Sequence, residues 1–166
     1  DATSIIIHEG RDLVKEGHID LLGLLESIDT KSVNAEGACR IDRLRGEVLA
    51  LLGRFDEAEE AFNQARPPAE ATGLKDVIAD ILSNLADIAL KRGDSESSLG
   101  MHRKALELFI ELKDAVGAAR SYNNMGYILR RSGDNTKALD AYSEVESILS
   151  EDKSKSLIPA QIVLAR

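Results

Sequence analysis

The sequence predicts an all-α fold, a right-handed superhelix of antiparallel helical hairpins, and two observations support this prediction. Alanine, leucine and glutamate dominate many windows, aromatic residues make up 4% of the chain, and the alternation typical of strands is scarce. The chain is also self-similar, because residues 79–109 superpose on residues 119–149 after a shift of 40. A further shift of 40 brings residues 39–65 into register, so three copies follow one another.

The third copy shows how each repeat is built. Gly133 is expected to end its first helix, because glycine accepts the left-handed conformation past a helix C-terminus. Asp134 can then cap the second helix by accepting hydrogen bonds from its free N–H groups. Both helices carry one apolar face at helical spacing. On the first helix these residues are Tyr122, Met125, Gly126 and Leu129, and on the second Ala138, Leu139, Tyr142 and Val145.

These residues resemble the tetratricopeptide repeat (TPR) family. The family pattern is a bulky residue, Leu-Gly, a large residue, and then alanine followed four positions later by an aromatic residue. The third copy meets it in order with Tyr122, Met125-Gly126, Leu129, Ala138 and Tyr142. The period of 40, rather than about 34, is similar to that of kinesin light chain arrays, and we expect longer second helices or connectors. HEAT-like hairpins are the rival fold, but the Gly-Asp turn favours the tetratricopeptide interpretation.

The repeats are expected to form one domain, residues 1–166. We predict a degenerate repeat at about 3–36, strong repeats at 39–72, 79–112 and 119–152, and a capping or truncated helix at 157–166. The predicted first helices are 3–16, 39–52, 79–92 and 119–132. Pro67-Pro68 is expected to end a second helix, because proline cannot continue its hydrogen bonds. The chain begins without Met and stops inside a helix-like pattern, so we expect it to be a piece of a longer protein.

Composition and motifs argue against several classes of function. The net charge of −8 argues against a nucleic-acid ligand, and no apolar run reaches the ~20 residues that span a bilayer. Cys39 stands alone, which excludes an internal disulfide, favours a cytoplasmic location and suggests a small buried side chain. His8, His18 and His102 are scattered, so we predict no metal site, no cofactor and no catalytic residue. The protein is therefore expected not to be an enzyme.

The functional surface is expected where the first helices line the concave side of the array. The first helices sum to a charge of +3 and the second helices to −12, so the concave side should attract an acidic segment. The alternative is that these charges only keep the protein in solution. The candidate peptide-binding residues are Arg43, Asn84, Asp87, Lys91, Arg120, Asn123, Asn124, Tyr127 and Arg131.

Two asparagines, Asn84 and Asn124, occupy the same place one repeat apart. An amide both donates and accepts, so a row of them can pair with the backbone of an extended peptide. The resemblance to kinesin light chain-like arrays implies this role, whereas the alternative is a hydrogen bond to neighbouring helix backbone. The carboxylate clamp of chaperone-tail-binding TPR domains fits less well. Arg43, Asn84 and Arg120 match it, but Glu47 replaces a required Asn and Asn124 a required basic residue.

We therefore predict a non-enzymatic scaffold or adaptor that binds a partner peptide, with an acidic segment as the expected ligand. The alternative function is a regulatory sensor segment of a larger signalling ATPase or transcription regulator, which the full-length gene would reveal. A third prediction is self-association through a solenoid end, because Ile158, Ile162 and Leu164 are apolar.

Overall fold

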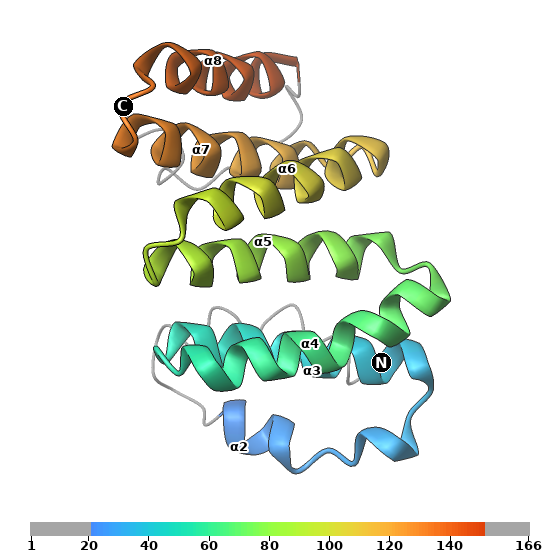
Figure 1. Ribbon diagram of the computed structural model, residues 1–166. Helices are drawn as coiled ribbons and strands as arrows, with labels where there is room; N and C mark the ends of the chain where they lie inside the picture. Colours follow the sequence, from blue (N-terminus) through green and yellow to red (C-terminus); the bar gives the residue numbers. More distant parts are fainter. Residues whose placement is uncertain (1–20, 152–166) are drawn as a thin grey trace. The chain divides into compact units, whose positions relative to one another are not determined.

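The computed structural model describes residues 21–151, which form seven α-helices and no β-strand (Figure 1). This confirms the predicted all-helical repeat fold. The chain forms two compact units, unit 1 with residues 1–77 and unit 2 with residues 78–166. The predicted helices at 3–16 and 157–166 lie outside the described residues. The elements are α2 (Leu21–Glu26), a 3₁₀-helix (Thr30–Ser32), α3 (Ala35–Leu51), α4 (Phe55–Thr72), α5 (Lys75–Lys91), α6 (Ser95–Glu111), α7 (Ala115–Arg131) and α8 (Asn135–Glu151).

The 40-residue period is divided equally between two helices. Each of α5 to α8 has 17 residues, and three-residue connectors join α5 to α6, α6 to α7 and α7 to α8. The first helices thus begin four residues earlier than predicted, and the extra length is not confined to second helices or connectors. At α7 the reason is a cap, because the Asp114 carboxylate accepts from the backbone N–H groups of Val116 and Gly117 at 3.1 and 3.0 Å.

Glycine and aspartate end one helix and begin the next, as predicted. Gly93 and Gly133 adopt φ values of 88° and 86°, in the left-handed region that glycine tolerates. Asp94 then accepts a hydrogen bond from the Ser97 N–H at 3.0 Å, which starts α6. Hydrogen bonding from the Ser97 side chain, together with this backbone bond, lowers the pKa of the Asp94 carboxyl below its ordinary value. The repeated turn therefore fixes where each hairpin reverses.

The prediction that Pro67-Pro68 ends a helix is wrong. Helix α4 continues through both prolines to Thr72 and ends at Gly73, which has a φ of 70°. The prolines leave the carbonyls of Asn63 and Gln64 without helical donors. Both of these residues are exposed, so water can bind their carbonyls, while the buried Ala69 keeps the last turn packed.

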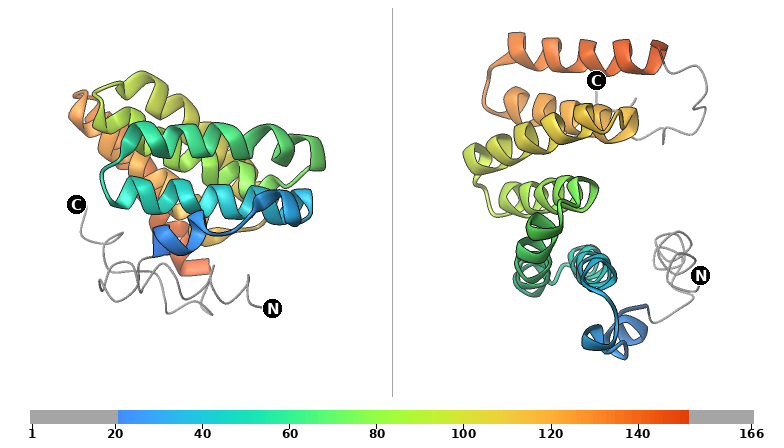
Figure 2. Two further views of the ribbon diagram at one scale, coloured as in Figure 1. Left: turned by 90° about the horizontal axis from the view of Figure 1, so that it is seen from below. Right: turned by 90° about the vertical axis from the view of Figure 1, so that its right-hand side faces the viewer.

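Paired small and aromatic residues hold each hairpin together. In unit 1, a Cβ added to Gly46 on α3 would lie 2.6 Å from the ring of Phe62 on α4. In unit 2, a Cβ on Gly126 would lie 2.6 Å from the ring of Tyr142. Figure 2 shows that the helices of these hairpins, α3 with α4 and α7 with α8, run side by side. The predicted close approach at Gly46 and Gly126 is confirmed.

The core of unit 2 is continuous across three helices. Phe109 of α6 packs with Ala79 of α5 and Ala118 of α7, and Tyr122 packs against this cluster, as predicted for a core aromatic. Leu139 does not belong to the predicted apolar stripe, because its side chain is 66% exposed. Its counterpart Leu99 packs against Leu129, Ala138 and Tyr142 of the following repeat. Leu139 has no such neighbour in the described part of the chain.

The lone cysteine is a buried packing residue, as predicted. Cys39 lies in α3, is fully buried, and has a pKa that burial raises above its ordinary value. A thiol in this state is a poor nucleophile. Among the described helices, none is both long enough and apolar enough to cross a membrane.

Candidate functional site

Most of the predicted binding residues form one polar surface on α5 and α7, which we call the α5–α7 face. Two contacts join its helices. The Arg120 Nη2 atom lies 3.2 Å from Asp80 Oδ1, and the Asn124 amide donates to Asp87 Oδ1 at 3.1 Å. Other members follow at helical spacing along the same two helices. The face comprises Asp80, Asn84, Asp87 and Lys91 of α5 with Arg120, Asn123, Asn124, Tyr127 and Arg131 of α7.

Arg120 has its charge balanced within the face. Besides its ion pair with Asp80, its guanidinium carbon lies 5.6 Å from the centre of the Phe109 ring. A cation over an aromatic face is favourable and also restrains the side chain. Arg120 therefore links α5, α6 and α7, and contributes less unbalanced positive charge than the sequence suggests.

The two asparagines are half-buried and use only part of their hydrogen-bonding capacity. Asn84 donates to the backbone carbonyl of Asp80 at 2.8 Å, which is the helix-backbone bond considered as the alternative. Asn124 donates to Asp87 instead. Within the described residues, neither amide oxygen accepts a hydrogen bond. Each side chain therefore retains an acceptor and one donor hydrogen for another group.

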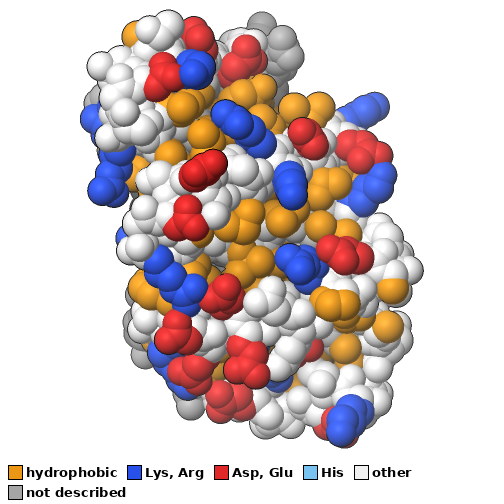
Figure 3. All heavy atoms as spheres, viewed as in Figure 1, with side chains coloured by type: hydrophobic (Ala, Val, Ile, Leu, Met, Phe, Trp, Pro, Cys, Tyr) orange, Lys and Arg blue, Asp and Glu red, His pale blue; other side chains and the backbone are white. Residues whose placement is uncertain are grey.

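Positive charge gathers at the C-terminal ends of the two helices. The guanidinium carbons of Arg130 and Arg131 each lie 5.8 Å from the centre of the Tyr127 ring, and Arg131 Nη1 donates to the Tyr127 hydroxyl at 3.4 Å. Lys91 is exposed at the end of α5. Cations there also suit the helix dipole. Elsewhere in unit 2, acidic, basic and apolar side chains are mixed on the face seen over α6, α7 and α8 (Figure 3).

Arg43 is separate from this surface. It lies in α3 of unit 1, is 5% exposed, and forms an ion pair with the buried Glu47 one turn away. A buried guanidinium that has a buried carboxylate partner is held by that pair. In this arrangement Arg43 does not present its charge to a ligand.

A second polar link lies in unit 1, where Arg40 of α3 donates to Asp76 Oδ2 of α5 at 2.7 Å. Burial alone raises the pKa of the Asp76 carboxyl, but the hydrogen bond and charge of Arg40 outweigh it, so the pKa lies below its ordinary value. The ion pair therefore stabilises the fold fully above about pH 4, the ordinary pKa of an unfolded aspartate. This stabilisation is lost as the pH falls through the lowered pKa.

We expect Asp76→Asn to lower the free energy of unfolding at pH 7, because Arg40 loses its charged partner on α5 and keeps only Glu36 on its own helix. The difference from the unsubstituted protein should shrink as the pH falls below about 4 and through the lowered pKa of Asp76, because Asp76 itself then becomes protonated. Urea denaturation at a series of pH values measures both quantities. Asp140→Asn, at an exposed position of α8, is the matched control. A difference that stays constant with pH would contradict the role given to this pair.

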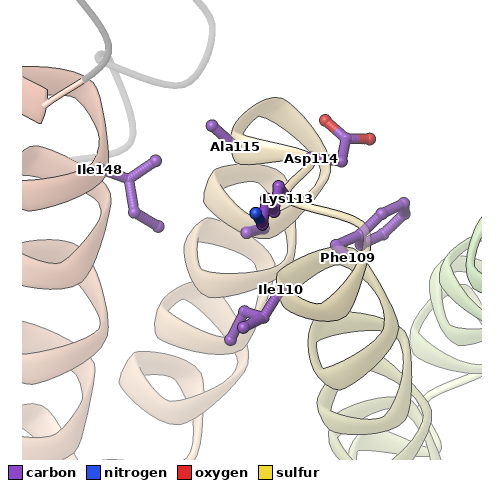
Figure 4. A pocket seen from close by; sticks show the side chains of 7 residues that line it. Phe109, Ile110, Lys113, Asp114, Ala115 and Ile148 are labelled. Atoms are coloured by element: carbon purple, nitrogen blue, oxygen red, sulfur yellow. The ribbon is translucent and has the colours of Figure 1, made fainter.

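Unit 2 also contains an open pocket of about 410 Å³ that the sequence did not indicate. In Figure 4, Phe109 and Ile110 come from α6, Lys113 and Asp114 from the following turn, Ala115 from α7, and Ile148 from α8 on the opposite side. Ala118 completes the lining. None of the residues that line the pocket belongs to the α5–α7 face, although the Phe109 ring also lies beneath the guanidinium of Arg120.

The sequence analysis did not predict that His102 lies beside the α5–α7 face. The 40-residue register puts it in the position of Phe62 and Tyr142, the aromatic partners of Gly46 and Gly126. Its Nε2 atom lies 3.2 Å from Asp87 Oδ1 on the α5–α7 face. The repeat register predicts a packed ring at position 102, whereas metal-ligand and catalytic spacings give no indication of it.

Comparison with known proteins agrees with the helical-repeat fold. Two family models, both described as tetratricopeptide repeat, match residues 77–151 and 37–73. A crystal structure of BtubC (BKLC) from P. vanneervenii is similar, with a TM-score of 0.71 and 23% sequence identity. The match covers 96% of this chain and 62% of that chain. At this identity the likeness concerns the fold alone. No curated protein sequence matches the chain.

Proposed function

Because the chain belongs to the tetratricopeptide repeat family, whose members act in protein–protein interaction, we propose that it is a non-enzymatic scaffold or adaptor whose α5–α7 face binds a partner peptide. The observation that carries this proposal is the pair of asparagines, Asn84 and Asn124. They stand one repeat apart, are half-buried, and keep their amide oxygens without donors in the described part of the chain.

A peptide backbone offers alternating N–H and C=O groups, and each asparagine can pair with both. Their own contacts favour this role, because the bonds from Asn84 to Asp80 and from Asn124 to Asp87 restrain the side chains before a guest arrives. Less rotational freedom is then lost on binding. We expect micromolar affinity, since the contacts are few and polar.

The charge of the face suggests the chemistry of the guest. Lys91 and Arg131 stand at the helix ends, and Lys91 is exposed with no ion pair among the described residues. An acidic residue of the guest would pair with them, and charge complementarity would speed the encounter. We place this binding in the cytoplasm.

The test is the double substitution Asn84→Ala, Asn124→Ala in the full chain. Its probe is a set of peptides selected on the unsubstituted chain from a random display library. We expect the double variant to bind these peptides about 10-fold to 30-fold more weakly, because two hydrogen-bonding side chains are lost. Isothermal titration calorimetry measures the affinity, and circular dichroism verifies that the helices remain.

The matched control is Asn63→Ala, Gln64→Ala, which removes two amides from the exposed surface of α4. Peptide affinity should not change in this variant. If the Asn84→Ala, Asn124→Ala variant also bound its peptides as tightly as the unsubstituted chain, the assignment of the face would be lost and the fold would stand.

A further inference from the structure

An imidazole occupies the aromatic slot of the middle hairpin. Phe62, His102 and Tyr142 share one position of the 40-residue register. Phe62 lies opposite Gly46 and Tyr142 opposite Gly126, and the register puts Ala86 in the corresponding place for His102. His102 is 0% exposed. A buried imidazole gives up the hydration of two ring nitrogens, whereas a phenyl ring gives up none. The loss of hydration alone would therefore favour phenylalanine here.

The polar contact of His102 leads to the α5–α7 face. Its Nε2 atom lies 3.2 Å from Asp87 Oδ1, a close polar contact that lacks the alignment of a hydrogen bond. Nδ1 has no hydrogen-bond partner among the described residues. Asp87 is thus the surface side chain that the buried ring contacts.

Asp87 differs from Asp80, the other acidic residue of the first helices α5 and α7 in unit 2. Its Oδ1 atom is held by Asn124 at 3.1 Å and approached by His102, yet its side chain is 50% exposed. Asp80 on the same helix is paired with Arg120. No lysine or arginine of the described residues pairs with Asp87. The result is a restrained carboxylate with one oxygen still available to another molecule.

We propose that Asp87 binds a cationic side chain of the guest peptide, and that His102 and Asn124 are positioning residues that hold its carboxylate. This inference rests on the proposed function and specifies its ligand. Lys91 lies one helical turn further along α5, about 6 Å away along the axis. Alternate residues of an extended chain are about 6.6 Å apart and point to the same side. The guest therefore carries a basic and an acidic residue two positions apart, the first at Asp87 and the second at Lys91.

The experiment is a parallel selection of random peptides on the full chain and on the Asp87→Asn variant. The unsubstituted chain should enrich peptides with Lys or Arg two positions from Asp or Glu. The Asp87→Asn variant should lose the preference for Lys or Arg, because the amide has no charge. Peptides from the first selection should bind Asp87→Asn about tenfold more weakly. Asp140→Asn, on the second helix α8, is the matched control and should preserve both preference and affinity.

The positioning role of His102 is tested by two variants in the same assay. His102→Phe is combined with Ala86→Gly, because Phe62 faces Gly46 and a Cβ there would overlap its ring. The melting temperature of this variant should equal or exceed that of Ala86→Gly alone. The affinity of the double variant for the selected peptides should nevertheless fall about threefold, with a weaker preference for Lys or Arg. His102→Gln keeps an N–H donor and should retain the preference. A purely structural histidine would not produce this separation of stability from specificity.

The possible outcomes separate the two proposals. Enrichment of peptides with no basic residue at a fixed position, or a basic preference that persists in Asp87→Asn, overturns the role of Asp87 and leaves peptide binding intact. An Ala86→Gly, His102→Phe variant with unchanged affinity and preference overturns the positioning role. No enrichment of any peptide overturns the proposed function and this inference together.

Discussion

A single methyl group added at Gly117 is expected to lower the free energy of unfolding by about 1–3 kcal/mol. A Cβ at this position would overlap the ring of Phe109, which is 2% exposed and packs in the centre of unit 2. The ring has no free space to enter, so α6 and α7 would have to move apart. Urea denaturation of Gly117→Ala, followed by far-ultraviolet circular dichroism, measures this loss.

The matched control for Gly117→Ala is Gly100→Ala. Gly100 lies inside α6, and a Cβ added there meets no atom within 4 Å. Alanine loses less backbone entropy than glycine on folding, so this variant should be about 0.5–1 kcal/mol more stable. Adding Phe109→Leu to Gly117→Ala should recover part of its loss by removing the ring. If both glycine variants were stabilised alike, the close approach of α6 and α7 would be refuted.

Removal of the Phe62 ring is expected to destabilise unit 1 by about 3–5 kcal/mol. Phe62 is fully buried, and its ring fills the space left by Gly46 on the facing helix. Alanine would leave a cavity, because neither α3 nor α4 has a side chain at this place that could fill it. Chemical denaturation of Phe62→Ala measures the effect. Hydrogen exchange should locate the lost protection first in α3 and α4, since repeats contact mainly their neighbours.

Leu51→Ala is the control for Phe62→Ala, because Leu51 ends α3 with its side chain 55% exposed. Its free energy of unfolding should change by no more than about 0.5 kcal/mol. Equal losses in the two variants would mean that the hairpin is not held by the Phe62–Gly46 contact.

Much of the fold follows from signals that act locally. The left-handed glycines at 93 and 133 and the capping carboxylates of Asp94 and Asp134 stop and restart helices through bonds within a few residues. Such bonds can be inferred from the sequence without knowledge of distant contacts. The Gly126–Tyr142 contact could be predicted as well, because the repeat fixes which helix faces which.

Features that depend on the wider environment were not predictable. Pro67 and Pro68 look like a helix end, yet α4 continues because the freed carbonyls are on exposed residues and Ala69 is packed. Leu139 matches the apolar stripe, but its burial requires a neighbour that the described residues do not supply. Arg43 carries a charge and was therefore predicted to be exposed. It is buried instead, and its ion pair with the buried Glu47 balances that charge.

The candidate site was predictable in outline, but its internal contacts were not. Helical spacing predicts that Asn84 shares a face of α5 with Asp87, and that Asn124 shares a face of α7 with Arg120, because the period of an α-helix fixes which residues lie on one side. The bonds from Asn124 to Asp87 and from Arg120 to Asp80 depend on the distance between α5 and α7, which the sequence does not contain. These contacts make the face less positive than the sequence suggests. Asp80 balances the charge of Arg120, whereas no lysine or arginine of the described residues balances that of Asp87.

The claim that a guest chain lies against the α5–α7 face is tested most directly by nuclear magnetic resonance of the asparagine side chains. A selected peptide is added at saturation to the full chain, and the side-chain NH₂ resonances are followed. The account predicts that those of Asn84 and Asn124 shift while that of Asn63, exposed on α4, stays in place. Unchanged resonances of Asn84 and Asn124, with shifts elsewhere in the spectrum, would contradict it.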